Sequence, residues 1–357
     1  MKTMPVDALL AYCRPGFEND LAAELTALAA SHGVSGFCRA RADTGWVEFR
    51  STPAADLGHL INAFPFSRLV FARQWWLLQA DLTNLPEGGR AGPIASALTG
   101  RLPAVTDVWL EYPDTNEGKA LSNFCARFRR PLLGELEKAG LRRASGAKWR
   151  LHLLFPDSSR VFAGLAPVAN SATAPLGIRR LRMPPGAPSR STLKLEEALR
   201  TFLDDSERQE WLRPGLTAVD LGASPGGWSW QFIRRSIRVT AVDNGPMDKR
   251  LIESGILAHR REDGFRYRPD KPVDWLVCDM VEKPQRIVEL MADWLVRGDA
   301  RRAIFNLKLP MKQRYACVAG CLDRLQERLD AAGPGYRLHC RQLYHDREEV
   351  TVGVFLD

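Results

Sequence analysis

The 357-residue sequence has no long hydrophobic run. No window approaches the ~18 uninterrupted apolar residues that a membrane-spanning helix needs. The N-terminal segment carries Asp7 and no extended apolar core, so it does not resemble a signal peptide. Apolar residues still make up 45% of the chain, enough for sizeable cores. These features predict a soluble, cytoplasmic protein with no membrane partner.

Cysteine pairs at disulfide or metal-binding spacings are also missing. The seven cysteines are an odd number, and they are scattered along the chain. Cys317 and Cys321 lie one helical turn apart, but no second pair of His or Cys accompanies them, whereas structural zinc takes four such ligands. The sequence therefore predicts neither a disulfide framework nor a metal site.

Acidic residues are scarce in one half of the chain. The net charge is +8, and residues 1–190 hold 23 Lys and Arg against 16 Asp and Glu, whereas residues 191–357 hold 27 against 26. A chain of this length predicts two or three compact units. A basic unit beside a nearly neutral one is typical of a polyanion-binding module attached to an enzyme, although many basic proteins bind no nucleic acid.

Two runs of cations lie in the basic half. Residues 179–182 hold three arginines, and residues 127–150 hold a longer run that is opposed by Glu135 and Glu137. One such run alone is commonly a solvated face. Two runs in the same half favour contact with RNA phosphates. The members of the longer run are Arg127, Arg129, Arg130, Lys138, Arg142, Arg143, Lys148 and Arg150.

The second half alternates predicted strands with predicted helices. Buried strands separated by helices predict a Rossmann-like, doubly wound α/β sheet with helices on both faces. The predicted strands are residues 217–222, 238–243, 256–261, 273–279, 303–308, 336–343 and 350–356. The predicted helices are residues 192–202, 228–236, 284–296 and 314–331.

The first half mixes strands with a helix at residues 16–28 and shows no βα repeat, which predicts an α+β region. Its predicted strands are residues 9–13, 45–49, 70–76, 108–112 and 150–155. Three prolines and a glycine in residues 184–188 preclude regular structure. The expected organisation is a basic α+β region at 1–183, a linker at 184–190 and the Rossmann-like domain at 191–357.

Residues 220–228, Asp-Leu-Gly-Ala-Ser-Pro-Gly-Gly-Trp, follow a predicted strand and open a predicted helix, where open α/β sheets bind nucleotides. The glycines allow close approach of the backbone to a ligand. Backbone N–H groups at a helix start suit a carboxylate, such as the methionyl end of S-adenosylmethionine. The spacing is not G-x-G-x-x-G, which disfavours a dinucleotide.

Carboxylates follow the next two predicted strands. Asp243 is placed to accept the ribose hydroxyls of an adenosyl group, and Asp263 is placed near its adenine. Either residue could instead cap an ordinary turn or helix, but their positions at strand ends favour the ligand role. Ser191 is predicted to cap the helix at 192–202. Lys194 then falls in the first turn, an unfavourable place for a cation and so a hint of function.

The ends of the fourth and fifth predicted strands carry Asp279 and Lys308, and Glu349 begins the last strand. Strand carboxyl ends line the ligand crevice of such a sheet. With Lys194, these residues predict two lysines and two carboxylates around one cleft.

The glycine-rich loop and these four residues resemble the FtsJ-like ribose 2′-O-methyltransferases and their Lys-Asp-Lys-Glu tetrad. The similarity is strongest to the members that methylate one cytidine of 23S ribosomal RNA, and it spans nearly the whole chain. The segments that carry it are residues 13–18, 71–75, 188–197, 242–247, 279–284, 305–312 and 341–352.

The resemblance implies S-adenosylmethionine as the cofactor and a small α/β subdomain followed by a THUMP RNA-binding domain in the first half. It implies a substrate of naked or partly assembled 23S ribosomal RNA, methylated near the peptidyl transferase centre. The implied catalytic residues are Lys308, Lys194, Asp279 and Glu349. The implied cofactor-binding residues are Ser191, Ser224, Pro225, Gly226, Gly227, Asp243, Asp263 and Asp279.

The residue types suit this chemistry. A ribose hydroxyl is a weak acid, so its attack on a methyl group needs a base, and a lysine serves only as the neutral amine. We expect Lys194 and local desolvation to lower the pKa of Lys308 against the opposing carboxylates, which orient the lysines and the ribose.

Two other functions remain open on the residues alone. An amine-directed base methyltransferase generally carries Asn/Asp-Pro-Pro-aromatic after the fourth strand, where this chain has Asp279-Met-Val-Glu. Cys278 could suggest a pyrimidine-C5 nucleophile, but a cysteine on a buried strand is more often part of the core. A non-catalytic RNA-binding protein would need no pairing of Lys194 with Lys308.

Overall fold

The computed structural model describes residues 6–333 and 335–357, so part of the segment judged unlike a signal peptide lies outside the described residues. The chain divides into two compact units, and the boundary between them in the sequence falls between Arg179 and Arg180. In the described ranges, no helix is both long and apolar enough to cross a bilayer.

Unit 1 is built on a mixed sheet of seven strands in the order β2-β3-β1-β4-β7-β6-β5. Its pairings are antiparallel except that of β5 with β6, so the predicted α+β character is confirmed. The strands are β1 (Ala8–Tyr12), β2 (Gly36–Ala40), β3 (Trp46–Ser51), β4 (Gln74–Leu82), β5 (Val105–Glu111), β6 (Trp149–Asp157) and β7 (Arg160–Pro167). The helices are α1 (Glu18–Ser31), α2 (Gly58–Ala63), α3 (Ala91–Leu98), α4 (Asn116–Lys119) and α5 (Ser122–Lys138), with short 3-10 turns at Phe66–Arg68, Val168–Asn170 and Pro175–Gly177.

The strand predicted at residues 70–76 is displaced toward the C-terminus. The backbone N–H groups of Val70 and Phe71 donate to the carboxylate of Glu24, at 2.5 and 3.0 Å, and so do not join a strand ladder. Regular pairing begins at Gln74. The buried carboxylate of Glu24 on α1 therefore accepts the hydrogen bonds that a neighbouring strand would accept if residues 70–76 formed the predicted strand.

Half of the longer basic run lies on α5, and part of the run is neutralised or buried. Arg150 lies in the interior, with its guanidinium 3.9 Å from the centre of the Trp109 ring. Arg129 donates to Asp107 at 3.2 Å, and Arg143 pairs with Glu137 at 2.7 Å. Within the described residues, the exposed members for which the structure shows no acidic partner are Arg127, Arg130, Arg142 and Lys148.

Unit 2 is built on a second sheet, with the strand order β10-β9-β8-β11-β12-β14-β13. The strands are β8 (Thr217–Leu221), β9 (Arg238–Val242), β10 (Leu257–Arg260), β11 (Val273–Cys278), β12 (Ala300–Lys308), β13 (Tyr336–Arg341) and β14 (Glu349–Leu356). The helices are α6 (Thr192–Phe202), α7 (Asp205–Trp211), α8 (Gly227–Ile233), α9 (Lys249–Ile252), α10 (Pro284–Val296) and α11 (Arg314–Ala332).

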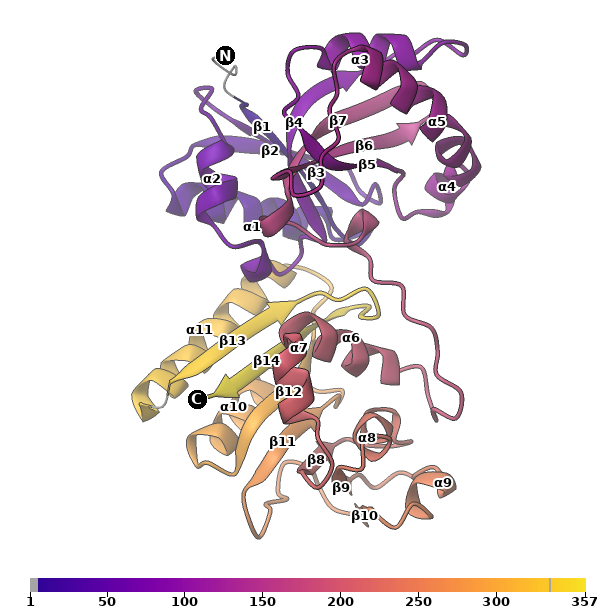
Figure 1. Cartoon of the computed structure of the whole chain (residues 1–357). Helices are drawn as coiled ribbons and strands as arrows, with labels where there is room; N and C mark the ends of the chain where they lie inside the picture. The colour runs from indigo at the N-terminus through magenta and orange to yellow at the C-terminus, as the bar shows by residue number, and fades with distance from the viewer. Residues whose placement is uncertain (1–5, 334) are drawn as a thin grey trace. The chain divides into compact units, whose positions relative to one another are not determined.

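The strand order reverses between β8 and β11, which are parallel neighbours. Strands β9 and β10 continue on one side and β12 on the other, all parallel, while β14 is antiparallel to both β12 and β13. Figure 1 shows α6, α7 and α8 on one face of this sheet and α10 and α11 on the other. The predicted doubly wound α/β class is confirmed, and its ligand crevice is expected at the carboxyl ends of β8 and β11.

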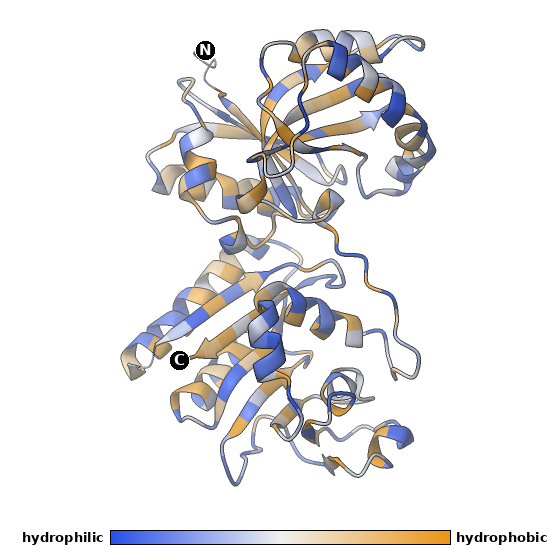
Figure 2. Cartoon of the chain, in the orientation of Figure 1, coloured by the Kyte–Doolittle hydropathy of each residue, from blue (hydrophilic) through white to orange (hydrophobic). Residues whose placement is uncertain are grey.

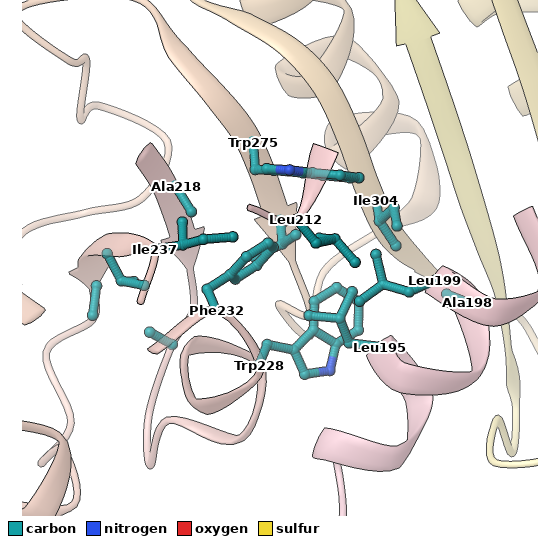
Figure 3. Packing of buried hydrophobic residues seen from close by; sticks show 14 of the residues in the cluster. Leu195, Ala198, Leu199, Leu212, Ala218, Trp228, Phe232, Ile237, Trp275 and Ile304 are labelled. Atoms are coloured by element: carbon teal, nitrogen blue, oxygen red, sulfur yellow. The ribbon is translucent and has the colours of Figure 1, made fainter. Parts of the chain in front are cut away.

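A hydrophobic core holds α6 and α8 against the sheet of unit 2. Figure 3 shows Leu195 and Leu199 of α6 beside Trp228, with Phe232 next to Trp275 of the central strand. The rings of Phe232 and Trp275 lie 5.8 Å apart between centroids. Hydrophobic colour follows the central strands of each unit in Figure 2. The apolar face of α6 thus fixes the position of its first turn, which carries Lys194.

Candidate active site

The glycine-rich loop leaves β8 at the point where the strand order reverses. Gly222 and Gly226 have φ angles of +76° and +110°, a region that side chains disfavour. A Cβ atom at Gly222 would lie 2.5 Å from Met280 Cγ, and one at Gly226 would lie 2.3 Å from Leu251 Cδ1. The loop is therefore a tightly folded backbone cradle at the expected ligand crevice, which suits the adenosyl and methionyl groups of S-adenosylmethionine.

Asp243, at the end of β9, organises this loop. Its carboxylate accepts hydrogen bonds from the backbone N–H of Ser224 at 3.0 Å and from that of Gly245 at 2.6 Å. The Ser224 hydroxyl donates to the carbonyl of Pro246 at 2.8 Å, which ties Pro225 and its neighbours to the β9 end. Each carboxylate oxygen keeps acceptor capacity, so Asp243 remains able to bind ribose hydroxyls.

Asp263 has a local role in the structure. Its carboxylate is half exposed and accepts a hydrogen bond from the backbone N–H of Phe265 at 2.9 Å. The turn it caps lies against the same crevice, because a Cβ atom at Gly264 would be 3.1 Å from Met280 Sδ and 3.6 Å from Leu221 Cβ. Asp263 thus both caps a turn and stands beside the cradle.

Ser191 lies next to the loop but does not cap α6, contrary to the prediction. It has helical φ and ψ angles and makes no capping hydrogen bond from its side chain. Its hydroxyl instead shares a hydrogen bond with Ser189 at 2.6 Å. Both hydroxyls would lie within 2.3 Å of a Cβ atom at Gly227, so Gly227 is required for this close approach.

The four residues of the predicted tetrad come together at the carboxyl ends of β11 and β12. Lys194 Nζ lies 3.2 Å from Asp279 and 2.5 Å from Glu349. Lys308 also pairs with both carboxylates. The register pairs Lys308 of β12 with Glu349 of β14, which explains how residues 41 positions apart meet. Two cations and two anions thus form a closed, partly buried square.

The pKa of Lys308 departs from the prediction in direction. Burial lowers it, but the charges of Asp279 and Glu349 outweigh burial, and the net shift is upward from the ordinary value. Lys194 is not among the main causes of the shift. The expectation that Lys194 and desolvation prevail is therefore wrong, because two carboxylates contact the ammonium directly.

Two side chains at the site carried no assigned role in the sequence prediction. Asn306 is fully buried on β12, and its amide donates to Asp279 at 3.0 Å. Asp220 is buried on β8 and accepts a hydrogen bond from the Ser229 hydroxyl at 2.6 Å. Burial raises the pKa of Asp220 to about 7. Its place at the head of the glycine-rich loop was the signal that could have identified it.

Cys278 has the environment of a core residue. It is fully buried at the end of β11, and burial raises the pKa of its thiol to about 12. A nucleophilic cysteine requires the thiolate, which this environment disfavours. Among the residues that the structure describes, no group of three or more His, Cys, Asp or Glu is arranged to hold a metal ion.

Three family models match consecutive parts of the chain. The RlmM ferredoxin-like domain matches residues 6–76, the N-terminal domain of ribosomal RNA large subunit methyltransferase M matches 89–167, and the FtsJ-like methyltransferase matches 187–293. The last range contains Lys194 and Asp279, whereas Lys308 and Glu349 lie beyond it. The match confirms the predicted methyltransferase class and S-adenosylmethionine as its cofactor.

Curated relatives match over almost the full length. Proteins named ribosomal RNA large subunit methyltransferase M are 48% identical in Ectopseudomonas mendocina, 46% in Cellvibrio japonicus and 51% in Alkalilimnicola ehrlichii. The alignments cover 97%, 97% and 96% of this chain and 98%, 98% and 93% of those proteins. This chain therefore belongs to the RlmM family of FtsJ-like methyltransferases.

Proposed function

We propose that this protein methylates the ribose 2′-hydroxyl of one cytidine in 23S ribosomal RNA, near the peptidyl transferase centre, in naked or partly assembled RNA. The observation that carries the proposal is the square of Lys194, Asp279, Lys308 and Glu349 beside the glycine-rich cradle. The relatives' name supports large-subunit RNA as the substrate, and the family resemblance supports the cytidine and its 2′-hydroxyl.

In this proposal, Lys308 is the general base. When bound, S-adenosylmethionine supplies an electrophilic methyl group on a sulfonium. The neutral Nζ of Lys308 takes the 2′-proton and becomes an ammonium, which Asp279 and Glu349 stabilise. Lys194 contacts the same two carboxylates and so helps to hold them in place beside Lys308. The buried thiol of Cys278 disfavours the pyrimidine-C5 alternative.

Removing the base should stop methyl transfer and leave cofactor binding intact. Lys308→Ala is expected to lower kcat by about 10²–10⁴-fold, and Lys308→Arg should fail similarly because a guanidinium stays protonated. Lys271→Ala, which removes an exposed lysine before the amino end of β11, is the matched control. The measurement is single-turnover transfer to an rRNA transcript. Near-normal activity of Lys308→Arg would exclude the base role.

The carboxylates predict a shift in the pH profile. Asp279 and Glu349 raise the pKa of Lys308, so removing one negative charge with Glu349→Gln should lower it. Since only the neutral amine acts as the base, the rising limb of kcat against pH should move to lower pH in Glu349→Gln. A limb that moves to higher pH, or does not move, would contradict Lys308 as the titrating group.

The cofactor role of Asp243 is tested by titration with S-adenosylmethionine. Asp243→Ala should weaken binding by about 1–3 kcal/mol, the effect of losing a charged hydrogen-bond acceptor. Glu253→Ala, which removes an exposed carboxylate just after α9, should bind normally. Unchanged affinity in Asp243→Ala would remove this residue from the cofactor site.

We further propose that the two halves of the protein have separate roles. Residues 1–183, which contain a small subdomain and a THUMP domain, bind RNA, and residues 191–357 transfer the methyl group. Residues 184–190 form the linker between these two regions. The four exposed cations defined above, Arg127, Arg130, Arg142 and Lys148, are assigned to phosphates. Changing all four to Ala should weaken RNA binding and reduce its salt dependence by a slope of about 0.7–0.9 per lost contact. Lys138→Ala is the control, since Glu135 already pairs with Lys138 at 2.7 Å. An unchanged salt slope would place the phosphate contacts elsewhere.

A further inference from the structure

A row of buried polar side chains continues from Asp279 into the protein interior. Asn306, Thr351 and Asp346 are each fully buried. The Thr351 hydroxyl lies 2.8 Å from Asn306 Oδ1 and 2.9 and 3.1 Å from the two carboxylate oxygens of Asp346. The Asn306 amide in turn lies 3.0 Å from Asp279 Oδ1. The row therefore joins a buried acid to a carboxylate of the tetrad.

The strand register explains why this row and the tetrad are continuous. Asn306 pairs with Thr351, and Lys308 pairs with Glu349, in the antiparallel ladder of β12 and β14. Residues two apart on a strand point to the same face, so both pairs lie on one face of the sheet. Asp346 lies in the turn before β14, where the backbone N–H of Leu343 donates to its Oδ2 at 2.9 Å.

The number of hydrogen atoms that each side chain can donate determines which group is the donor in each hydrogen bond of this row. Asp279 accepts hydrogen bonds from two lysine side chains, so Asn306 must present its NH₂ group to this carboxylate. Asn306 Oδ1 then faces Thr351 and must accept the single hydroxyl hydrogen. With that hydrogen used, the contact between Thr351 and Asp346 requires a hydrogen from Asp346.

We propose that Asp346 is a protonated, neutral carboxylic acid and that Asp346, Thr351 and Asn306 form a directed hydrogen-bond chain that positions Asp279. Every hydrogen in the chain points toward Asp279, an arrangement in which successive bonds strengthen one another. The assignment of the acid stands on geometry, and the catalytic consequence rests on the function proposed above.

The electrostatic surroundings agree with a neutral acid. Burial raises the pKa of Asp346 well above its ordinary value, and the charge of Glu349 raises it further, as does that of Glu197 from α6. The Leu343 N–H acts in the opposite direction, as the Thr351 hydroxyl would if it donated to Asp346, but each effect is weaker than that of burial. An ionised Asp346 would add a further negative charge to the interior, near the carboxylates of Glu349 and Glu197.

Through Asn306, this hydrogen-bond chain gives Asp279 a contact with a rigid donor. Lys194 and Lys308 are flexible side chains, and one of them must release its proton or move during the reaction. Asn306 is fully buried on a central strand and so stays in place. The positioning residues are therefore Asn306, Thr351 and Asp346. They keep the carboxylate of Asp279 directed at Lys194 and Lys308 during proton transfer.

The activity test compares three substitutions in the full-length protein. Thr351→Val removes the hydroxyl at similar volume and should lower kcat by about 10–100-fold, as expected when a buried hydrogen bond is lost and its partners are left unsatisfied. Thr351→Ser should restore kcat. Asp346→Asn should retain it, because the amide supplies both a donor for Thr351 and an acceptor for Leu343. The KM for RNA and the affinity for S-adenosylmethionine should stay unchanged in all three.

Three activity results would overturn the proposal. Normal kcat in Thr351→Val would show that the chain does not position Asp279. A loss in Asp346→Asn as large as that in Thr351→Val would show that the carboxylate charge matters. A loss of cofactor affinity parallel to kcat would indicate general damage to the fold.

Carbon-13 NMR of protein labelled at the aspartate carboxyl tests the protonation state without any variant of Thr351. The signal that disappears in Asp346→Asn belongs to Asp346, and it should show the protonated form at neutral pH. An ionised signal there would overturn the proposal. Because this readout needs no RNA, a methyl group found on the base would refute the proposed function and leave the assignment of Asp346 standing.

Discussion

The double contact of Asp279 with Lys194 and Lys308 is the interaction on which the site depends. The carboxylate lies at the end of β11, and the two ammonium groups reach it from α6 and β12. Glu349 closes the square from β14, and Asn306 holds Asp279 from behind. Removing any one charge leaves the others unbalanced in a partly buried place, so the four residues act as a unit.

The fold brings these residues together through two simple constraints. Parallel strands present their carboxyl ends at one edge of the sheet, which places the glycine-rich loop after β8 next to Asp279 after β11. The core beneath α6 fixes the helix that carries Lys194, through Leu195 and Leu199 packed near Trp228. The antiparallel register of β12 and β14 then sets Lys308 opposite Glu349.

The sequence predicted the fold of unit 2 well because its central strands β8 and β11 are largely apolar and are followed directly by Gly222 and Asp279. The strands containing Val219 and Val277 begin where predicted, and the bounds of α10 match. Unit 1 was harder, since the hydrophobic run at Val70 is held by a side chain of α1, a long-range contact that no local pattern reveals.

The site residues were found because they follow strands, but their electrostatics depend on distances that sequence does not contain. The pKa of Lys308 rises because two carboxylates touch it, whereas the sequence favoured the repulsion of a second lysine. Asp346 lies within the segment 341–352 but had no predicted role, since its burial becomes visible only when β14 folds against β12. Arg150, counted among the surface cations, lies inside against Trp109 for a similar reason.

The central claim is that the methyl group goes to a ribose oxygen through this tetrad. Mass spectrometry of nucleosides from the 23S ribosomal RNA of a deletion strain tests it most directly. We predict that one cytidine loses a ribose methyl group and that the intact gene, but not a gene encoding Lys308→Ala, restores it. A methyl group located on the base, or ribose methylation that persists in the deletion strain, would contradict the account.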